Sequence, residues 1–538
     1  MMKKALALFL SFLMLMAALV SCGSDEKDEE IAELKEMLEQ LIEEKEKENT
    51  INASKETGKD IVTNALTTEI TTVVTSDTTA VTTVQTTAAT EAPVAEPEYP
   101  DYGGRTFNIL SAGNTAYNDF DCEYNGYTSL EIAQYDRVAT VEQIYNVDIV
   151  EEIKQGYSSA TSGKPGAGYS AINSQVASGT VNYDLCLIAG YDVAQLASQG
   201  YLYDMNSIPG IDLTQSYWDQ NAVRDLSSKG VTFFTTGDIT LSDENAASCI
   251  LFNKKLADDY NIDPYELVKS GEWTIEKLTE LSKKVSEDLN QDGVYDENDR
   301  YGLLVWDDSV LGMVNAAGQR VASFKENGEI ELTFYNEMTL DALYKYAEIA
   351  YDTEHALQYQ RYNNSGPADK FWNGNLGLFL TTSISNVEKY SEEVEFGFLP
   401  YPKAYVTQEN YYTHISPFSS QFVCVPLIVE DIECVGTVTE ALAYYGEKLV
   451  TPKFYDLLLS NGSYDDTEIL ELIFDNFIYD IGYYYQIGSY NKQLILRLRE
   501  KKSDWSVMYD TQRPSADVTI KSINSAYKQA VDLWIPNT

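Results

Sequence analysis

The sequence predicts an α/β fold with two lobes, because short apolar strands alternate with helical patterns over a long region. Residues 105–110, "RTFNIL", and residues 147–153, "VDIVEEI", are predicted strands, and residues 129–146 between them have a helical period. The pattern continues to the end of the chain. Residues 100–538 are too many for one hydrophobic core, so we expect two lobes, each built on a parallel sheet covered by helices.

The chain begins with a secretory signal. Lys3 and Lys4 precede a short apolar run that ends at Leu19-Val20-Ser21-Cys22. This run is short for a helix that spans a bilayer. The ending resembles a bacterial lipobox, which implies a signal peptide of residues 1–21 and a lipid such as palmitate on the Cys22 thiol. A plain secretory signal with an incidental Cys is the alternative.

Two segments separate Cys22 from the folded region. Residues 22–62 contain a charged helical pattern with too few apolar heptad positions for a coiled coil, so we expect a solvated stalk. Residues 63–99 consist largely of Thr, Ala and Val. Such a composition cannot offset the entropy of ordering, which predicts a disordered linker.

Composition narrows the function. The chain has 38 Lys and Arg against 84 Asp and Glu, a formal charge of −46 that repels nucleic acid. Only two histidines, His355 and His414, are present, which leaves few candidates for His-based catalysis. The cysteines other than Cys22 are Cys122, Cys186, Cys249, Cys424 and Cys434. An odd number without a CxxC motif predicts neither a disulfide framework nor a zinc site, although one disulfide remains open.

Several segments together resemble a known family. They are residues 183–208, 250–262, 271–288, 370–382 and 395–403, which include "GEWTIEKLTEL", "KFWNGNLGLFLTT" and "EFGFLPYPK". Their order and spacing, from about Arg105 to Trp534, resemble the extracellular solute-binding proteins of ABC importers (family 1, carbohydrate type).

The resemblance implies a two-lobe, periplasmic-binding-protein-like (type II) fold with a hinged cleft. Lobe 1 would contain about residues 100–233 and 415–450, and lobe 2 about 234–414 and 451–538. Such a protein captures a small solute, here a sugar or oligosaccharide, and delivers it to an ABC transporter permease without chemical change. With a lipid on Cys22, it would be held on the extracytoplasmic face of the cell membrane.

Residues 288–299, "DLNQDGVYDEND", match the spacing of an EF-hand calcium loop. The loop positions 1, 3, 5, 7, 9 and 12 are filled by Asp288, Asn290, Asp292, the Val294 carbonyl, Asp296 and Asp299, with Gly293 at position 6. Position 12 is usually Glu, and the shorter Asp predicts a modest affinity. A strand pattern, "RYGLLVW", follows instead of a second helix, so we expect a structural Ca²⁺ clamp and no sensor. An Asp/Asn/Gly-rich surface turn is the alternative.

In sheets of this kind, ligands bind at the carboxyl ends of strands. The residues that follow predicted strands are Ser111, Asn114, Gly190, Tyr191, Trp306, Thr382 and Ser383. Trp306 is the strongest candidate, because its ring beside Asp307 and Asp308 suits a sugar, although a core Trp is an equal alternative. Asp238 and Glu244 lie near the expected lobe crossing and are either cleft acceptors or solvated residues.

Two other classes compete with a binding protein. A surface glycoside hydrolase would use a pair of carboxylates, but so many acidic residues make any chosen pair a weak argument. The chain has no GxSxG, HExxH or phosphate-loop motif. An adhesive or structural lipoprotein would suit the stalk and linker, but adhesive domains are often β-sandwiches, whereas this chain alternates strand and helix.

Overall fold

The computed structural model describes residues 65–73, 81–89, 99–113, 119–120, 128–156, 164–296, 298–359, 366–390, 394–459 and 464–534. The predicted signal peptide, Cys22 and the stalk of residues 22–62 lie outside these ranges, as does Asn114. The chain divides into two compact units, Met1–Glu98 and Tyr99–Thr538, which are treated separately. Within the described ranges, we find no helix with both the length and the apolar character needed to cross a bilayer.

The first unit contains one β-hairpin within the Thr-rich linker. β1 (Ala65–Val73) pairs antiparallel with β2 (Val81–Ala89), with Ala65 opposite Ala89. Many residues of both strands are Thr or Val, whose β-branched side chains favour extended backbone. A two-stranded sheet is only marginally stable in water, so this hairpin adds no second folded domain to the predicted linker.

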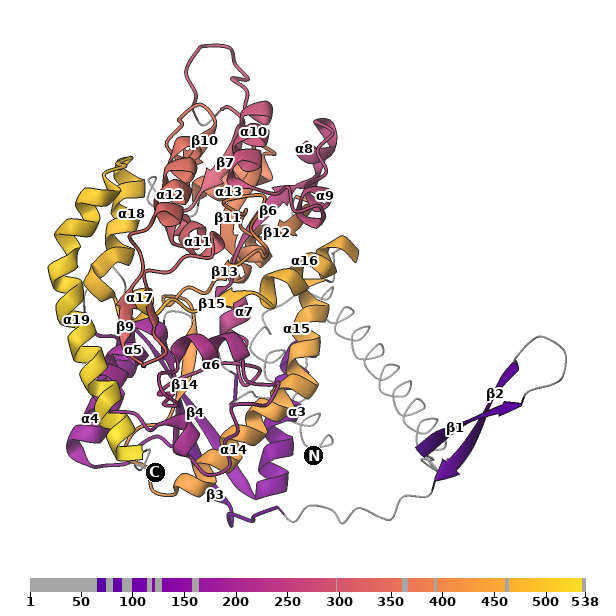
Figure 1. Ribbon diagram of the computed structural model, residues 1–538, viewed down its shortest axis with the longest axis vertical. Coiled ribbons are helices and arrows are strands. Elements are labelled where there is room, and N and C mark those ends of the chain that lie inside the picture. Colours follow the sequence, from indigo (N-terminus) through magenta and orange to yellow (C-terminus); the bar gives the residue numbers. More distant parts are fainter. Residues whose placement is uncertain are drawn as a thin grey trace, which may run out of the picture. The chain divides into compact units, whose positions relative to one another are not determined.

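The first lobe of the second unit is built on a sheet with the order β14-β5-β3-β4 (Figure 1). Its strands are β3 (Arg105–Gly113), β4 (Val147–Gln155), β5 (Leu185–Ala189) and β14 (Gln421–Cys424). β3 is parallel to β4 and β5, whereas β14 is antiparallel to β5. The helical elements of this lobe are α3 (Ser129–Tyr145), α4 (Ala167–Ser178), α5 (Gly190–Ser198), η1 (Met205–Ser207), α6 (Gln220–Leu226), α14 (Ile432–Tyr445), η4 (Gly446–Val450) and α15 (Thr451–Leu458).

The second lobe is built on a sheet with the order β10-β7-β11-β6-β12. Its strands are β6 (Ser248–Asn253), β7 (Tyr301–Val305), β10 (Ala356–Gln358), β11 (Gly377–Ser383) and β12 (Phe396–Leu399), and a separate pair is β8 (Ala322–Phe324) with β9 (Ile330–Leu332). The helical elements are α8 (Lys254–Asp259), α9 (Pro264–Lys269), α10 (Ile275–Val285), α11 (Ser309–Ala316), α12 (Glu337–Ala350), α13 (Gly366–Asn373), η3 (Ile384–Tyr390) and α16 (Tyr464–Phe474).

Neither sheet is fully parallel, which corrects the expectation from the sequence. β14 is antiparallel in the first sheet, and β6 is antiparallel to β11 and β12 in the second. Each of these two strands is the first that the chain enters after passing from one lobe to the other. A strand that arrives from the opposite lobe does not follow a helical crossover, and therefore it is not bound to the parallel direction.

The chain passes between the lobes at three places, and the first and third of these differ from the expected boundaries. Residues up to about Leu241 stay with the first lobe. Thr235 N–H donates to the Val423 carbonyl at 3.1 Å, Val423 N–H donates to the Thr235 carbonyl at 2.8 Å, and Ile239 lies in the first-lobe core. The first crossing is therefore α7 (Ser242–Ala246) and not residue 234. α15 packs on α3 and α16 packs on β12, so the third crossing lies after Leu458 and not at residue 450.

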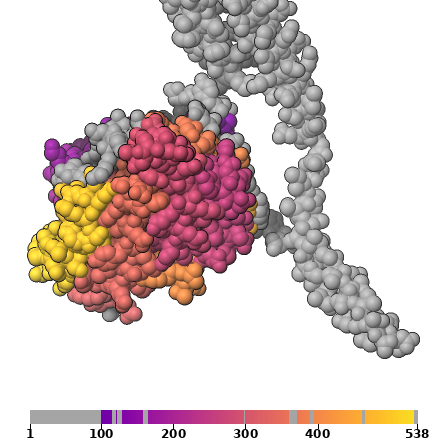
Figure 2. Space-filling model, turned by 90° about the horizontal axis from the view of Figure 1, so that it is seen from above, coloured from indigo at the N-terminus to yellow at the C-terminus, as the bar shows by residue number. Residues whose placement is uncertain are grey.

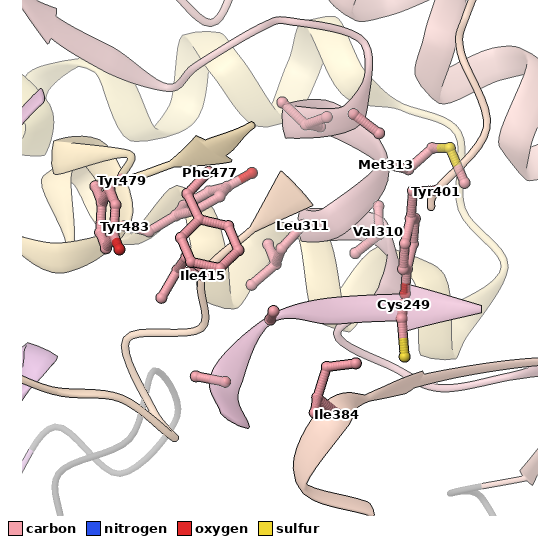
Figure 3. Packing of buried hydrophobic residues seen from close by; sticks show 14 of the residues in the cluster. Cys249, Val310, Leu311, Met313, Ile384, Tyr401, Ile415, Phe477, Tyr479 and Tyr483 are labelled. Atoms are coloured by element: carbon pink, nitrogen blue, oxygen red, sulfur yellow. The ribbon is translucent and has the colours of Figure 1, made fainter. Parts of the chain in front are cut away.

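The second crossing runs beside a later segment of the chain. β13 (Thr413–His414) pairs in parallel with β15 (Phe477–Ile478) between the two main sheets. Figure 3 shows Ile415 and Phe477 of these segments beside Leu311 of α11. All three side chains belong to one buried apolar cluster that contains residues of both lobes, such as Cys186 and Cys249. The lobes therefore share a core at the crossing.

The C-terminal helices contact both lobes. They are α17 (Ile481–Tyr484), η5 (Ile487–Ser489), α18 (Tyr490–Glu500) and α19 (Trp505–Trp534). α19 packs on α5 of the first lobe and β9 of the second, and it runs alongside both in Figure 1. In Figure 2 the C-terminal segment, in yellow, lies against the second lobe. α19 is therefore shared between the lobes and does not belong to lobe 2 alone.

The described cysteines are all free thiols. Cys186, Cys249, Cys424 and Cys434 are buried and unbonded, whereas Cys122 lies outside the described residues. Burial raises the pKa of the Cys434 thiol to about 11, so this group is protonated at neutral pH. Within the described part of the chain, the cysteines act as small apolar core residues.

Candidate functional site

Three side chains from different elements converge between the lobes. Tyr191 lies at the start of α5, directly after β5 of the first sheet. Asp308 follows β7 of the second sheet. The pKa of the Tyr191 phenol is raised by the burial of Tyr191 and by the charge of the Asp308 carboxylate. Asn491 of α18 donates a hydrogen bond from Nδ2 to the Tyr191 hydroxyl at 3.2 Å. The carboxyl ends of strands from both sheets therefore meet at one place.

Two tyrosines of α17 complete this group. Tyr483 and Tyr484 are buried, and both are close enough to Tyr191 for the phenols to influence one another electrostatically. The Tyr484 hydroxyl donates to the Ile415 carbonyl at 3.1 Å. Among the described atoms, the Tyr483 hydroxyl and the Asn491 Oδ1 have no hydrogen-bond partner. We call Tyr191, Asp308, Tyr483, Tyr484 and Asn491 the interlobe cluster.

Unpartnered polar atoms in a buried position are costly, so they indicate a binding site. A cavity of about 250 Å³ adjoins the interlobe cluster and is lined by Tyr191 and Tyr484. Its other lining residues are Lys164, Gln195, Ser198, Tyr485, Gln486, Thr519, Ser522 and Ile523. Most of these side chains offer a hydroxyl, an amide or an aromatic face. Such a lining suits a small neutral molecule rich in hydroxyl groups.

Buried carboxylates gather at the first crossing. The Tyr479 hydroxyl lies 2.7 Å from Asp219 and 3.3 Å from Asp243. A phenol has one proton, so it cannot fully satisfy both carboxylates. Burial and the Asp219 charge raise the pKa of Asp243 to about 7, and burial with Asp243 raises the pKa of Glu244 well above its usual value. One of these two carboxyl groups is thus protonated near neutral pH.

Several predicted site residues have structural partners instead. The Ser111 hydroxyl donates to the buried Glu151 carboxylate. Gly190 N–H donates to the Ser420 carbonyl at 3.2 Å, and a Cβ at Gly190 would lie 2.9 Å from Pro417. These two residues fix the first sheet and the second crossing. Their position at strand ends is as expected, but their polar groups are used by the fold.

Asp238 is also held by its own lobe. Its carboxylate accepts a hydrogen bond from the Thr451 hydroxyl of α15. Burial raises the pKa of Asp238 to about 6, and the neighbouring Glu447 carboxylate adds to this shift. The structure therefore places Asp238 between the first crossing and α15, apart from the interlobe cluster. Glu244 lies in α7 beside Asp243, at the crossing where the sequence placed it.

Trp306 follows β7 and lies beside the end of β11, because β7 and β11 pair in parallel. The backbone N–H of Trp306 donates to the Thr381 hydroxyl at 2.7 Å, next to Thr382. The Trp306 ring is half-buried and packs against the core, which favours the core-Trp alternative. Thr382 and Ser383 are buried, and the hydroxyls of Ser383 and Ser385 form a hydrogen bond of 2.9 Å.

The predicted calcium loop folds back on its own backbone. The Asp288 carboxylate accepts from Gly293 N–H at 2.8 Å, and Gly293 has φ +81°, as position 6 of such a loop requires. The buried Asp299 carboxylate accepts from Leu289 N–H at 2.9 Å and from Asp296 N–H at 2.8 Å. The loop shape and the oxygen donors suit Ca²⁺. In the described ranges, however, no group of three His, Cys, Asp or Glu side chains is arranged to hold a metal.

The sequence did not identify Asn491, Tyr483, Tyr484, Asp219 or Asp243 as site residues. Asn491 and the tyrosines come from C-terminal helices that follow no strand, so the rule of strand ends does not select them. The run of residues 479–485, "YDIGYYY", was the available signal, because so many phenols in one short stretch need buried partners.

Comparison with known proteins agrees with this arrangement. Residues 157–416 match the family described as bacterial extracellular solute-binding protein. The fold is similar to the ABC substrate-binding protein Lmo0181 from Listeria monocytogenes in complex with cycloalternan, with a TM-score of 0.51 and 15% identity over 78% of this chain and 99% of that chain. It is also similar to UspC of M. tuberculosis, with a TM-score of 0.50 and 12% identity over 77% and 100% of the two chains. The sequence matches no curated protein.

The family match confirms the resemblance found in the sequence: residues 157–416 of this chain are similar to the bacterial extracellular solute-binding proteins. The structural similarity confirms the two-lobe, periplasmic-binding-protein-like (type II) fold. At these identities the similarity extends to the fold alone, so the solute must be argued from the residues of this chain.

The buried carboxylates predict a specific pH dependence. Burial raises the folded-state pKa of Asp308 to about 6, above its usual value of 3.8, so the folded protein binds more protons than the unfolded chain between these values. The free energy of unfolding should therefore rise as the pH falls from about 7 to about 5. Asp308→Asn should make this rise smaller, as measured by urea unfolding at each pH.

Asp258→Asn, which changes an exposed carboxylate of α8, is the matched control and should keep the full pH dependence. If Asp308→Asn and Asp258→Asn had the same pH dependence as the unaltered protein, the assignment of Asp308 as a half-buried group with a raised pKa would be wrong.

Proposed function

We propose that this protein captures a small sugar or oligosaccharide between its lobes and releases it unaltered to an ABC transporter permease. The observation that supports this most is the interlobe cluster, in which Asn491 of α18 donates a hydrogen bond to Tyr191 of the first lobe at 3.2 Å and the Asp308 carboxylate of the second lobe acts electrostatically on the same phenol. A ligand that contacts both would hold the lobes in a closed arrangement, because it gains its full set of contacts only there.

The chemistry of the cluster favours a carbohydrate. Aromatic rings contact the apolar face of a sugar ring, while a carboxylate and amides accept and donate to its hydroxyls. The free Asn491 Oδ1 and Tyr483 hydroxyl fit an exchange of hydrogen bonds with such hydroxyls. Lmo0181, whose fold is similar, is in complex with the saccharide cycloalternan. The cavity of about 250 Å³ is of a size for one sugar unit beside the cluster.

We further propose that a lipid on Cys22 holds the protein on the extracytoplasmic face of the membrane. The support is the lipobox-like ending of the signal and the extracellular family that the folded region matches. The linker of residues 63–99 would then give the folded unit reach from the membrane surface. A captured solute would then be within range of a permease in the same membrane.

The loop of residues 288–299 is proposed as a structural Ca²⁺ site. Asp288, Asn290, Asp292, Asp296, Asp299 and the Val294 carbonyl would supply the oxygen ligands. Several of these carboxylates accept backbone N–H groups, so binding requires them to turn toward the ion. The ends of the loop are already joined, because Glu287 and Arg300 form a backbone bridge. The ion would reinforce this turn between α10 and β7.

Saccharide binding is tested by a thermal-shift screen of mono- and oligosaccharides followed by calorimetry. We expect one saccharide class to raise the Tm without being consumed. Tyr191→Ala removes an aromatic face and a hydroxyl and should weaken binding by about 10-fold or more. Tyr344→Ala, at an exposed tyrosine of α12, is the control and should bind normally. A complete screen in which no saccharide raises the Tm would contradict the proposal.

Calcium binding is tested by thermal unfolding with added CaCl₂ and with EDTA. Calcium should raise the Tm of the unaltered protein, because it binds only the folded loop. Asp292→Ala removes a central ligand and should abolish the calcium response, while Asp258→Ala should retain it. An unchanged calcium response in Asp292→Ala would exclude this loop as the site.

A further inference from the structure

A second cavity lies between the lobes, away from the interlobe cluster. It has a volume of about 380 Å³ and is lined by Arg224 and Asp225 of α6 in the first lobe. From the second lobe it is lined by the segment after α11, including Arg320. Tyr479, between β15 and α17, forms part of its wall. No residue that the sequence or the interlobe cluster assigns to the solute lines this cavity.

The lining of this cavity carries two guanidinium groups and one carboxylate. Asp225 accepts a hydrogen bond from Arg224 Nε at 2.9 Å and another from an Arg320 terminal nitrogen at 2.9 Å. It also accepts from the Tyr479 N–H at 3.2 Å. Two guanidinium groups of the lining thus share one carboxylate. Asp219 and Asp480 also lie near them, because the Asp219 charge acts on Arg224 and the Arg320 charge acts on Asp480.

The two arginines have donors beyond those that Asp225 uses. A guanidinium has five N–H donors arranged in a planar fork that matches a carboxylate or a phosphate. The structure shows one bond from Arg320 to Asp225, and bonds from Arg224 to Asp225 and Asn221. Ser323 adds a hydroxyl, and Phe324 adds an apolar wall to the same cavity. These groups suit an anionic head attached to a small organic body.

We propose that this cavity is a binding site for a small carboxylate or phosphate anion, separate from the solute site. The anion pairs with Arg320 and Arg224, and Asp225 competes with it for the same guanidinium groups. Arg320 belongs to the second lobe and Asp225 to the first, so the anion replaces an ion pair between the lobes. Binding is therefore coupled to the relative position of the lobes.

Calorimetry with inorganic phosphate and with gluconate tests the proposal, and sodium chloride at equal ionic strength is the reference. The protein should bind at least one of the two anions saturably, and the pair of probes distinguishes phosphate from carboxylate as the preferred head group. Arg320→Gln should raise the Kd about 10-fold or more. Asp225→Asn should lower the Kd, because it removes the competing carboxylate while both arginines remain.

Arg513→Gln is the matched control, because Arg513 is exposed on α19 and pairs with Asp517 outside the cavity. It should bind the anion as the unaltered protein does. The opposite effects of Arg320→Gln and Asp225→Asn separate anion binding from a loss of folding, since damage to the fold would weaken binding in both. The proposal is wrong if neither anion binds more than chloride does, if Arg320→Gln binds normally, or if Asp225→Asn binds more weakly.

Discussion

The connection between the two lobes depends on two adjacent residues, Tyr479 and Asp480, which lie between the lobes and form hydrogen bonds with opposite lobes. The Tyr479 hydroxyl reaches Asp219 of the first lobe at 2.7 Å. The next residue, Asp480, accepts hydrogen bonds from Val321 N–H at 2.7 Å and Gly482 N–H at 2.8 Å, on the side of the second lobe. Successive side chains of an extended chain point in opposite directions, so one short segment can bind both lobes.

This arrangement determines where a solute can be bound. The crossing segments share a buried core with α11, so the lobes stay together at the crossing and can move only around it. The strand ends of both sheets face the space beside it, so that the Asp308 carboxylate of the second lobe helps to raise the pKa of the Tyr191 phenol of the first lobe. Carboxylates with raised pKa values are concentrated in the same region, at Asp243 and Asp308. Function and hinge therefore occupy one part of the molecule.

The sequence was informative where local rules apply. Alternating strands and helices predicted the two α/β lobes, and the rule of strand ends selected Tyr191 and placed Trp306 beside Asp308. Prediction from the sequence failed for residues whose hydrogen-bond partners are distant in the sequence. The Ser111 hydroxyl donates a hydrogen bond to Glu151, and the Asp238 carboxylate accepts one from Thr451. No local sequence pattern reveals either pair. Asn491 reaches Tyr191 from a helix three hundred residues further along the chain, so only the folded structure could identify it.

Closure of the lobes on a saccharide is the central claim, and energy transfer between two fluorophores measures it directly. One label on Ser178 of α4 and one on Lys255 of α8 would report on the distance between the lobes, because both residues are exposed. The account predicts that transfer efficiency increases saturably with the saccharide that binds, and that the saccharide is recovered intact. A saccharide that binds with no change in transfer, or that is converted to another compound, would contradict it.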